Sequence, residues 1–245
     1  MTRIYLPVTH IEEGQIQITG DKAHYLTSVL RCKKGDEIIV FNGKGCCMRT
    51  RIVKAERKEV GIEVLERVSC EADSTVHITL VQGLLKGEKM DLIVQKTTEL
   101  GVTEIIPVMT ERCQVRATRK LERWRKIGQE ASRQSGRSIV PVIHSPVALE
   151  RVFETYSLQE RMCGFVFYEK GGMDLSRAMQ QISHRNRFSP VQIFIGPEGG
   201  FTRGEIARAR EKGLIVTSFG RRILRAETAA IAAVTLVQFL LGDMH

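Results

Sequence analysis

The chain has 245 residues, which is enough for one large domain or two modest domains with a sizeable core. With 42% hydrophobic and 27% charged residues, it has the composition of an ordinary globular protein, which excludes a low-complexity or disordered chain. The 37 lysines and arginines outnumber the 28 acidic residues, and the resulting formal charge of +9 favours a polyanionic partner. The longest apolar run, 229–241, is too short to cross a bilayer, and the N-terminus lacks a signal-peptide pattern. We therefore expect a cytoplasmic protein with no membrane partner.

The first 72 residues are predicted to form mainly β-strands. One helix, at 21–31, interrupts them, and short strands joined by tight turns are typical of a small β-barrel. The predicted strands cover 3–8, 14–20, 36–45, 47–57 and 59–68. In the fourth strand Arg49 and Arg51 are two positions apart, so both should point to the same face, where they could contact phosphates.

A polar, turn-like passage at 69–75 marks a change of pattern, and we place a domain boundary there, giving domains 1–72 and 73–245. After it, strands alternate with helices, which predicts a parallel sheet with helices on both faces. The predicted strands cover 76–82, 103–108, 139–143, 164–168, 191–196 and 214–220. The predicted helices cover 88–101, part of the basic segment 112–137, 146–156, 174–184, 202–213 and the stretch from about 226.

Two of these helices carry specific signals. Thr202 and Glu205 form a capping-box pattern that predicts the start of a helix, and Gly213 marks its end. The last helix is apolar nearly all round, which predicts burial against its own sheet or against a partner subunit. We expect a homodimer.

Most of the excess positive charge lies in segment 112–137, which has nine lysines and arginines against two acidic residues. Such a segment suits RNA, although a solvated helix face is an equal alternative when the segment is considered alone. We expect Trp124 to belong to the core because it shares helical spacing with Leu121 and Ile127. The cysteines form no CxxC pair and the histidines have no zinc-like spacing, so we expect no metal.

Two loops at the carboxyl ends of predicted parallel strands should be neighbours: "GPEGG" at 196–200 and "GRRILRAE" at 220–227. The glycines of the first loop let the backbone approach a ligand closely, or they simply make a tight turn. No GxxxxGK[ST] motif is present and no GxGxxG motif follows an early strand, so a triphosphate and a dinucleotide are both disfavoured.

Four motifs carry a resemblance to a known family: "KGEKMDLIVQKTTELGV" at 86–102, "RWRKIGQEASRQSGRSIVP" at 123–141, "GPEGGF" at 196–201 and "LRAETAA" at 224–230. The chain resembles the RsmE-type ribosomal RNA methyltransferases of the SPOUT superfamily. "HYLTSVLRCKKGDEIIVFNGKG" at 24–45 is similar to the first domain of that family. Cys113 is a mild departure from the family pattern, which has a small residue at this position.

The resemblance implies a PUA-like β-barrel followed by an α/β methyltransferase domain with a deep trefoil knot. It implies a homodimer that methylates N3 of uridine 1498 in the 16S rRNA of the small ribosomal subunit, with S-adenosylmethionine as cofactor. The residues that the resemblance assigns to cofactor binding are Gly196, Pro197, Glu198, Gly199, Gly200, Leu224, Arg225, Glu227, Thr228 and Ala229.

For catalysis, the imide proton on N3 of uracil must be lost before the nitrogen becomes a good nucleophile, which calls for a carboxylate or for cations near O2 and O4. The candidate bases are Glu99, Glu169, Glu198 and Glu227, and the sequence does not rank them. We predict Arg225, Glu227 and Glu99 as catalytic residues. The predicted RNA contacts are Arg3, Arg31, Arg49, Arg51, Arg112, Arg116, Arg119, Arg123, Arg133 and Arg137.

Three other functions are weighed against this one. A ribose 2'-O-methyltransferase of the same superfamily would need a base for an alcohol. A non-catalytic RNA-binding assembly factor would tolerate bulky residues in "GPEGG". An enzyme acting on nucleotide phosphates has no motif in its favour.

Overall fold

The computed structural model describes residues 1–7, 14–155, 163–183 and 190–244. The chain forms two compact units. The first consists of Met1–Asp73 together with Ser132–Val140, and the second of Ser74–Ala131 together with Pro141–His245. The chain therefore passes between the units three times, whereas the sequence predicts a single boundary. No helix in the described part of the chain is long and apolar enough to span a membrane.

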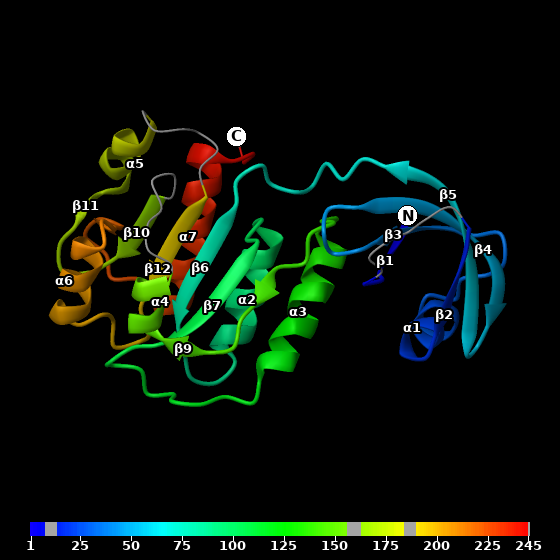
Figure 1. Cartoon of the computed structure of the whole chain (residues 1–245), viewed down its shortest axis with the longest axis horizontal. Helices are drawn as coiled ribbons and strands as arrows, with labels where there is room; N and C mark the ends of the chain where they lie inside the picture. Colours follow the sequence, from blue (N-terminus) through cyan, green and yellow to red (C-terminus); the bar gives the residue numbers. More distant parts are fainter. Residues whose placement is uncertain (8–13, 156–162, 184–189, 245) are drawn as a thin grey trace. The chain divides into compact units, whose positions relative to one another are not determined.

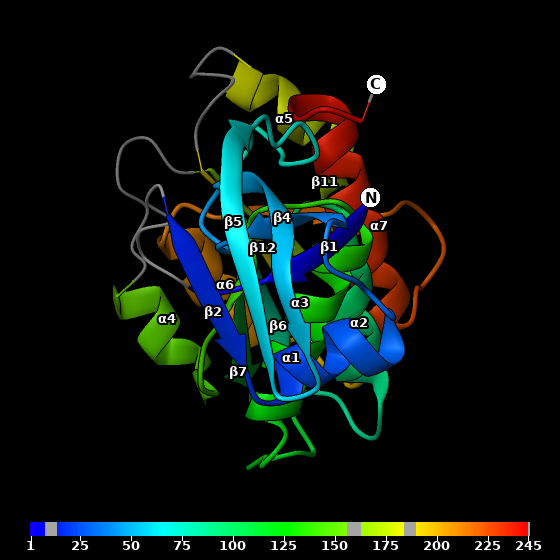
Figure 2. The same cartoon turned by 90° about the vertical axis from the view of Figure 1, so that its right-hand side faces the viewer.

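The first unit contains a five-stranded sheet with the order β1-β3-β4-β5-β2. Its strands are β1 (Thr2–Tyr5), β2 (Gln15–Thr19), β3 (Glu37–Phe41), β4 (Cys47–Glu56) and β5 (Glu59–Val68). β1 is parallel to β3, and the other pairs are antiparallel. Figure 2 faces this sheet, with β4 and β5 as its long strands. Within the described residues, pairing runs from β1 to β2 without joining these two end strands.

The predicted helix at 21–31 is α1 (Asp21–His24), which continues into a π-helical turn, η1 (Tyr25–Val29). Ala23 and Leu26 are fully buried in the core of this unit.

Segment 132–140 is attached to the first unit by hydrogen bonds with Asp73 and with the backbone of residues 43–45. The Asp73 carboxylate accepts hydrogen bonds from the backbone N–H groups of Ser138 at 3.0 Å and Ile139 at 3.1 Å, and from the Ser138 hydroxyl. It also pairs with Arg137 Nε at 3.4 Å. In the second set of contacts, the Val140 N–H donates to the Gly43 carbonyl at 3.0 Å, and the Gly45 N–H donates to the Ser138 carbonyl at 3.4 Å. Both sets of contacts join the segment to residues more than sixty positions away, which no local sequence pattern indicates.

The second unit contains a parallel sheet with the order β11-β13-β10-β12-β6-β7-β8, with β9 pairing with β7. Its strands are β6 (Ile78–Gly83), β7 (Glu104–Met109), β8 (Val142–Ile143), β9 (Val147–Ala148), β10 (Cys163–Phe167), β11 (Met173–Asp174), β12 (Val191–Ile195) and β13 (Ile215–Ser218). The central strands are almost wholly apolar, as strands buried on both faces must be. The predicted parallel sheet is confirmed.

Helices cover both faces of this sheet. They are α2 (Lys89–Glu99), α3 (Leu121–Gln134), α4 (Leu149–Thr155), α5 (Leu175–Ser183), α6 (Arg203–Glu211) and α7 (Ala226–Leu241). Along β12, Ile193 packs in the cluster that includes α2, α3, α5 and α7, whereas Phe194 packs with α4 and α6. Figure 1 shows α7 and α2 on one side of β6 and β12, and α4 and α6 on the other.

The predicted helices of the second unit are all present. Residue 8 of the first predicted strand, residue 156 and residue 184 lie outside the described residues. Thr202 and Glu205 form the predicted capping box, and Trp124 is 2% exposed, as expected for a core residue. α7 buries Ala230 and Val234 against the sheet. The trefoil knot that the resemblance implies stays a prediction.

Candidate functional site

The loops after β10, β12 and β13 surround one cavity of about 510 Å³. These three strands are neighbours in the sheet and run in parallel, so their carboxyl ends lie at the same edge. Loops 196–201 and 219–225 both line the cavity, which confirms that the two predicted loops are neighbours.

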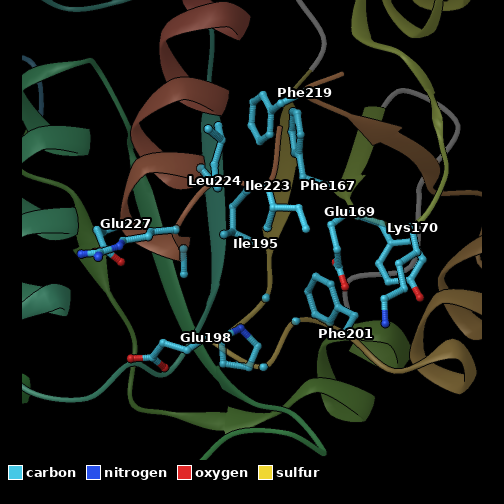
Figure 3. Close-up of a pocket in the computed structure, with 18 of the residues that line it drawn as sticks. Phe167, Glu169, Lys170, Ile195, Glu198, Phe201, Phe219, Ile223, Leu224 and Glu227 are labelled. Carbon is cyan, nitrogen blue, oxygen red and sulfur yellow. The ribbon is translucent and has the colours of Figure 1, made fainter. Parts of the chain in front are cut away.

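One wall of the cavity is apolar. Phe167 stacks on Phe219 with 4.4 Å between the ring centroids and 16° between the ring planes. Figure 3 shows these two rings above Ile195 and Ile223, with Leu224 to one side and Glu198 at the opposite end. The wall offers a flat surface on which a planar ring can stack.

Two glycines let the backbone approach closely around the cavity. Gly200 has φ +65°, and a Cβ built there would lie 3.2 Å from the Glu169 carboxylate oxygens. Gly83, at the end of β6, lies against the loop, and a Cβ there would lie 2.5 Å from the backbone nitrogen of Pro197. A side chain at position 83 would force the loop away from β6, and a side chain at position 200 would be strained because of the positive φ.

Three carboxylates line the cavity, and they differ in their surroundings. Glu198 Oε1 accepts hydrogen bonds from Lys89 Nζ at 2.9 Å and from the backbone N–H of Lys86 at 3.2 Å. Burial alone would raise the pKa of Glu198, but these hydrogen bonds outweigh it, so the pKa lies below its ordinary value. Glu198 is therefore a stable anion that holds its loop and is poorly suited to accept a proton.

Glu227 lies in the first turn of α7, where a carboxylate is favoured by the helix dipole. Its Oε2 atom is buried and has no hydrogen-bond partner in the structure. A buried polar atom without a partner carries a free-energy cost, which a ligand that donates a hydrogen bond would remove. The third carboxylate, Glu169, is exposed beside Gly200.

The structure brings most of the predicted cofactor residues together. Those that line the cavity are Gly196, Pro197, Glu198, Gly199, Gly200, Leu224, Arg225, Glu227 and Ala229. Thr228 does not line it, and its side chain is exposed because it lies on the outer side of the first turn of α7.

Glu99 is also absent from the cavity lining. It lies at the C-terminal end of α2, where Lys96 Nζ donates to its carboxylate at 2.9 Å. The geometry of the cavity gives no support to its predicted catalytic role.

Sequence reasoning missed several lining residues: Lys89, Phe167, Tyr168, Lys170, Phe201, Phe219, Arg222 and Ile223. Phe167 and the residues after it could have been predicted from the sequence. β10 is a predicted parallel strand, so its carboxyl end must lie at the same edge of the sheet as the carboxyl end of β12. No comparable signal exists for Lys89, since it opens a helix whose proximity depends on the pairing of β6 with β12.

The predicted RNA contacts have different surroundings. Arg137 is 1% exposed and pairs with Asp73, so its prediction as a phosphate contact is wrong: burial leaves no route to RNA. Arg112 donates to backbone carbonyls of the glycine loop. Arg123 pairs with Asp91 at 2.8 Å, and Trp124 Nε1 donates to the same carboxylate at 3.0 Å.

The other predicted contacts are more accessible. Arg49 and Arg51 both reach the Glu37 carboxylate, at 3.8 and 3.1 Å, which confirms that they share a face. Arg3 donates to the backbone carbonyl of Arg137. Arg133 lies over the ring of Tyr25, while Arg31, Arg116 and Arg119 are exposed.

Among the residues that the structure describes, no group of three or more histidine, cysteine, aspartate or glutamate side chains could hold a metal ion.

Comparisons with known proteins match this architecture. Residues 72–238 match the family model of an RNA methyltransferase domain, and residues 18–65 match that of an RNA methyltransferase PUA domain. Ribosomal RNA small subunit methyltransferase E of Bacillus subtilis is 32% identical, over 98% of this chain and 96% of the relative. The enzyme of the same name from Synechocystis is 33% identical, over 98% of this chain and 78% of the relative.

Solved structures agree. Ribosomal RNA small subunit methyltransferase E from Neisseria gonorrhoeae, bound to S-adenosylmethionine, superposes with a TM-score of 0.90 at 33% identity and full coverage of both chains. A Legionella pneumophila protein in complex with the same cofactor gives 0.85 at 30% identity, again over the whole of both chains.

Proposed function

The chain belongs to the RNA methyltransferase family that includes the ribosomal RNA small subunit methyltransferases E, and from this membership we propose that it methylates N3 of uridine 1498 in 16S rRNA with S-adenosylmethionine as donor. The observation that supports this proposal most directly is the cavity at the ends of β10, β12 and β13, in which the buried Glu227 Oε2 has no hydrogen-bond partner.

The residues of the cavity fit S-adenosylmethionine. The stacked rings of Phe167 and Phe219, with Ile195, provide an apolar surface for the adenine. The glycine loop offers backbone groups for hydrogen bonds without side chains in the way. No phosphate has to be bound, which is consistent with Lys89 being paired with Glu198.

When bound, the cofactor supplies an electrophilic methyl group on a sulfonium. The work of the chain is to place uracil N3 in line with that methyl group and to remove its proton. We propose that Glu227 Oε2 accepts the N3 proton. This buried oxygen has no hydrogen-bond partner, and an N–H donor that enters the cavity would supply one. Arg225, the N-cap of α7 and an exposed lining residue, is positioned to balance negative charge that develops on the uracil oxygens.

RNA binding is proposed for the exposed arginines of both units. In the first unit these include Arg31 and Arg51, with the partly exposed Arg49 beside Arg51, and in the second Arg116 and Arg119. Because phosphate contacts supply the salt-dependent part of affinity, they would position 16S rRNA without reading its sequence. The predicted domain 1–72 would thus serve as an RNA-binding domain and 73–245 as the catalytic domain, in the cytoplasm.

We also propose that the protein works as a homodimer. Leu236, Phe239 and Leu240 are 37%, 58% and 43% exposed on α7. Their spacing places them on one face of the helix, and a contiguous apolar face of this kind is typical of a subunit interface.

The test is to incubate the purified protein with S-adenosylmethionine labelled on the methyl group and with 16S rRNA or small subunits from cells that lack the enzyme. We expect one labelled methyl at N3 of uridine 1498, located by mass spectrometry of RNA fragments. A label on a ribose oxygen would identify a 2'-O-methyltransferase instead. Failure to bind the donor in calorimetry would indicate a non-catalytic assembly factor.

A further inference from the structure

Arg112 begins the basic segment, yet its guanidinium faces the glycine loop. Nη1 donates to the backbone carbonyl of Gly199 at 3.1 Å and to that of Phe201 at 3.4 Å. Gly199 and Phe201 both line the cavity, while Arg112 does not. The contact therefore reaches the outer side of the loop whose inner side forms the cavity wall.

The aliphatic part of Arg112 fits the same loop closely. A Cβ built on Gly199 would lie 3.0 Å from Cβ of Arg112 and 3.5 Å from its Cδ. A glycine at 199 thus has a second purpose besides exposing backbone to a ligand, because it leaves space for the arginine stem.

The residue before Arg112 is attached to the far end of the loop. The backbone N–H of Glu111 donates to Glu205 Oε1 at 2.9 Å, and Glu205 Oε2 accepts from the N–H of Thr202 at 2.7 Å. Glu205 is 1% exposed, so this link is shielded from water. Arg112 consequently holds the loop directly at Gly199 and Phe201, and Glu111 is linked to Thr202 through the Glu205 carboxylate.

A second segment holds the loop at Glu198. The backbone N–H of Lys86 and the Nζ of Lys89 both donate to this carboxylate. The loop therefore has partners on two sides. Backbone groups that must recognise a donor without phosphates gain affinity when their orientation is fixed before binding, since less conformational entropy is lost.

We propose that Arg112 is a positioning residue for the methyl donor: it fixes the backbone at 199–201 from outside the cavity, and it is not a phosphate contact. The inference rests on the proposed function. It separates Arg112 from Arg119, an exposed arginine of the same segment that remains a proposed RNA contact.

The decisive variant is Arg112→Met, which keeps an unbranched stem over Gly199 and removes the donors. Arg112→Lys returns a cationic donor. Arg119→Ala is the matched contrast, because Arg119 is an exposed arginine of the same segment. Arg151→Ala, an exposed arginine on α4, is the neutral control.

Calorimetry with S-adenosylmethionine alone should show the donor Kd of Arg112→Met raised about tenfold, which corresponds to the net contribution of about one hydrogen bond. Hydrogen exchange of the amides at 199–202 should accelerate. In steady-state assays the KM for donor should rise while the KM for RNA stays unchanged, and Arg112→Lys should recover part of the loss. Arg119→Ala should leave the KM for donor unchanged and raise the KM for RNA.

Wild-type donor affinity in Arg112→Met together with weakened RNA binding would overturn the inference and restore the phosphate role. If Arg112→Met does not fold, the donor affinity and the RNA affinity of Arg112→Lys are compared with those of wild type, and the same two outcomes apply. A wild-type protein that binds no donor would instead contradict the proposed function, so the two failures are distinguishable.

Discussion

Glu227 combines two properties that mark a functional carboxylate: it lines the cavity, and one of its oxygens is buried without a partner. Buried polar atoms in folded proteins almost always have a partner, so this exception needs an explanation. A ligand N–H supplies one. Glu198 has no such vacancy, because Lys86 and Lys89 already satisfy its Oε1 atom.

Glu227→Gln should reduce methyl transfer at pH 7 by at least about 100-fold, the usual contribution of a general base. The amide keeps the size and an acceptor oxygen, so donor affinity should change little. Single-turnover rates between pH 6 and pH 10 provide the check. The variant should gain rate steeply with pH because only solvent can then remove the N3 proton. If the methyl-transfer rate of Glu227→Gln lies within about threefold of the wild-type rate, another group accepts the N3 proton. Glu169→Gln is the matched control.

The Lys89–Glu198 pair predicts a pH effect. Burial raises the pKa of Glu198, and hydrogen bonds from Lys89 and from the backbone more than offset it, so the folded pKa is below the ordinary 4.5. The pair therefore stabilises the protein fully above the unfolded pKa, and this contribution is lost as pH falls toward the folded pKa.

Lys89→Met should raise the pKa of Glu198, because burial then acts against fewer hydrogen bonds. Carboxyl NMR titration measures this directly. The thermal midpoint of wild type should also fall more between pH 6 and pH 3 than that of the variant. An unchanged Glu198 pKa would show that the backbone donors alone set it.

Arginines show the limit of sequence reasoning at this scale. Trp124 was correctly predicted as buried because its partners share its helix spacing. Arg112 and Arg137 were predicted as phosphate contacts because they lie in a run of cations. Their partners in the structure, Gly199 and Asp73, are 87 and 64 positions away, and nothing local in the sequence points to them.

At the scale of elements, α7 uses two faces. Ala230, Ala233 and Val237 are fully buried, whereas Leu236 and Phe239 are exposed. The sequence correctly predicted that the helix is apolar nearly all round. It could not assign which face packs on the sheet, because both faces are mainly apolar.

Phe239→Glu should convert the proposed dimer into a monomer, because a charge in an apolar interface lacks a partner. Analytical ultracentrifugation at micromolar concentration provides the measurement. Val29→Glu, which replaces another exposed apolar side chain in the first unit, is the control and should leave the mass unchanged. A wild-type protein that sediments as a monomer would refute the dimer.

Most elements were predictable because their ends carry local chemistry. The capping box of Thr202 and Glu205 fixes the start of α6, and Gly213 with φ +79° follows its end. The return of 132–140 to the first unit was not predictable, because it depends on contacts with distant residues, the Asp73 carboxylate and the backbone of residues 43–45.

For the whole molecule, Asp73→Ala should destabilise the first unit by about 3 kcal/mol, the usual cost of breaking a buried ion pair. The loss also removes acceptors from the N–H groups of Ser138 and Ile139. Urea unfolding provides the measurement. Adding Arg137→Met should recover part of the loss, and additive losses in the double variant would show that the two side chains are not coupled.

Donor binding should stabilise the protein through the second unit, since every lining residue of the cavity belongs to it. At a donor concentration of 100 times Kd, the free energy of unfolding should rise by about 2.7 kcal/mol. Asp73→Ala should show the same donor-induced increment, measured by thermal unfolding with and without donor. A smaller increment in that variant would mean that the first unit contributes to donor affinity.

The three passages of the chain between its units have an evolutionary consequence. A single recombination event near residue 73 would join the opening region of one gene to the remainder of another, and 132–140 would then come from a different parent than the aspartate that holds it. Such hybrids would be viable only when both parents keep compatible residues at these positions. The two units of this protein should therefore be inherited together, and their gene trees should have the same branching order.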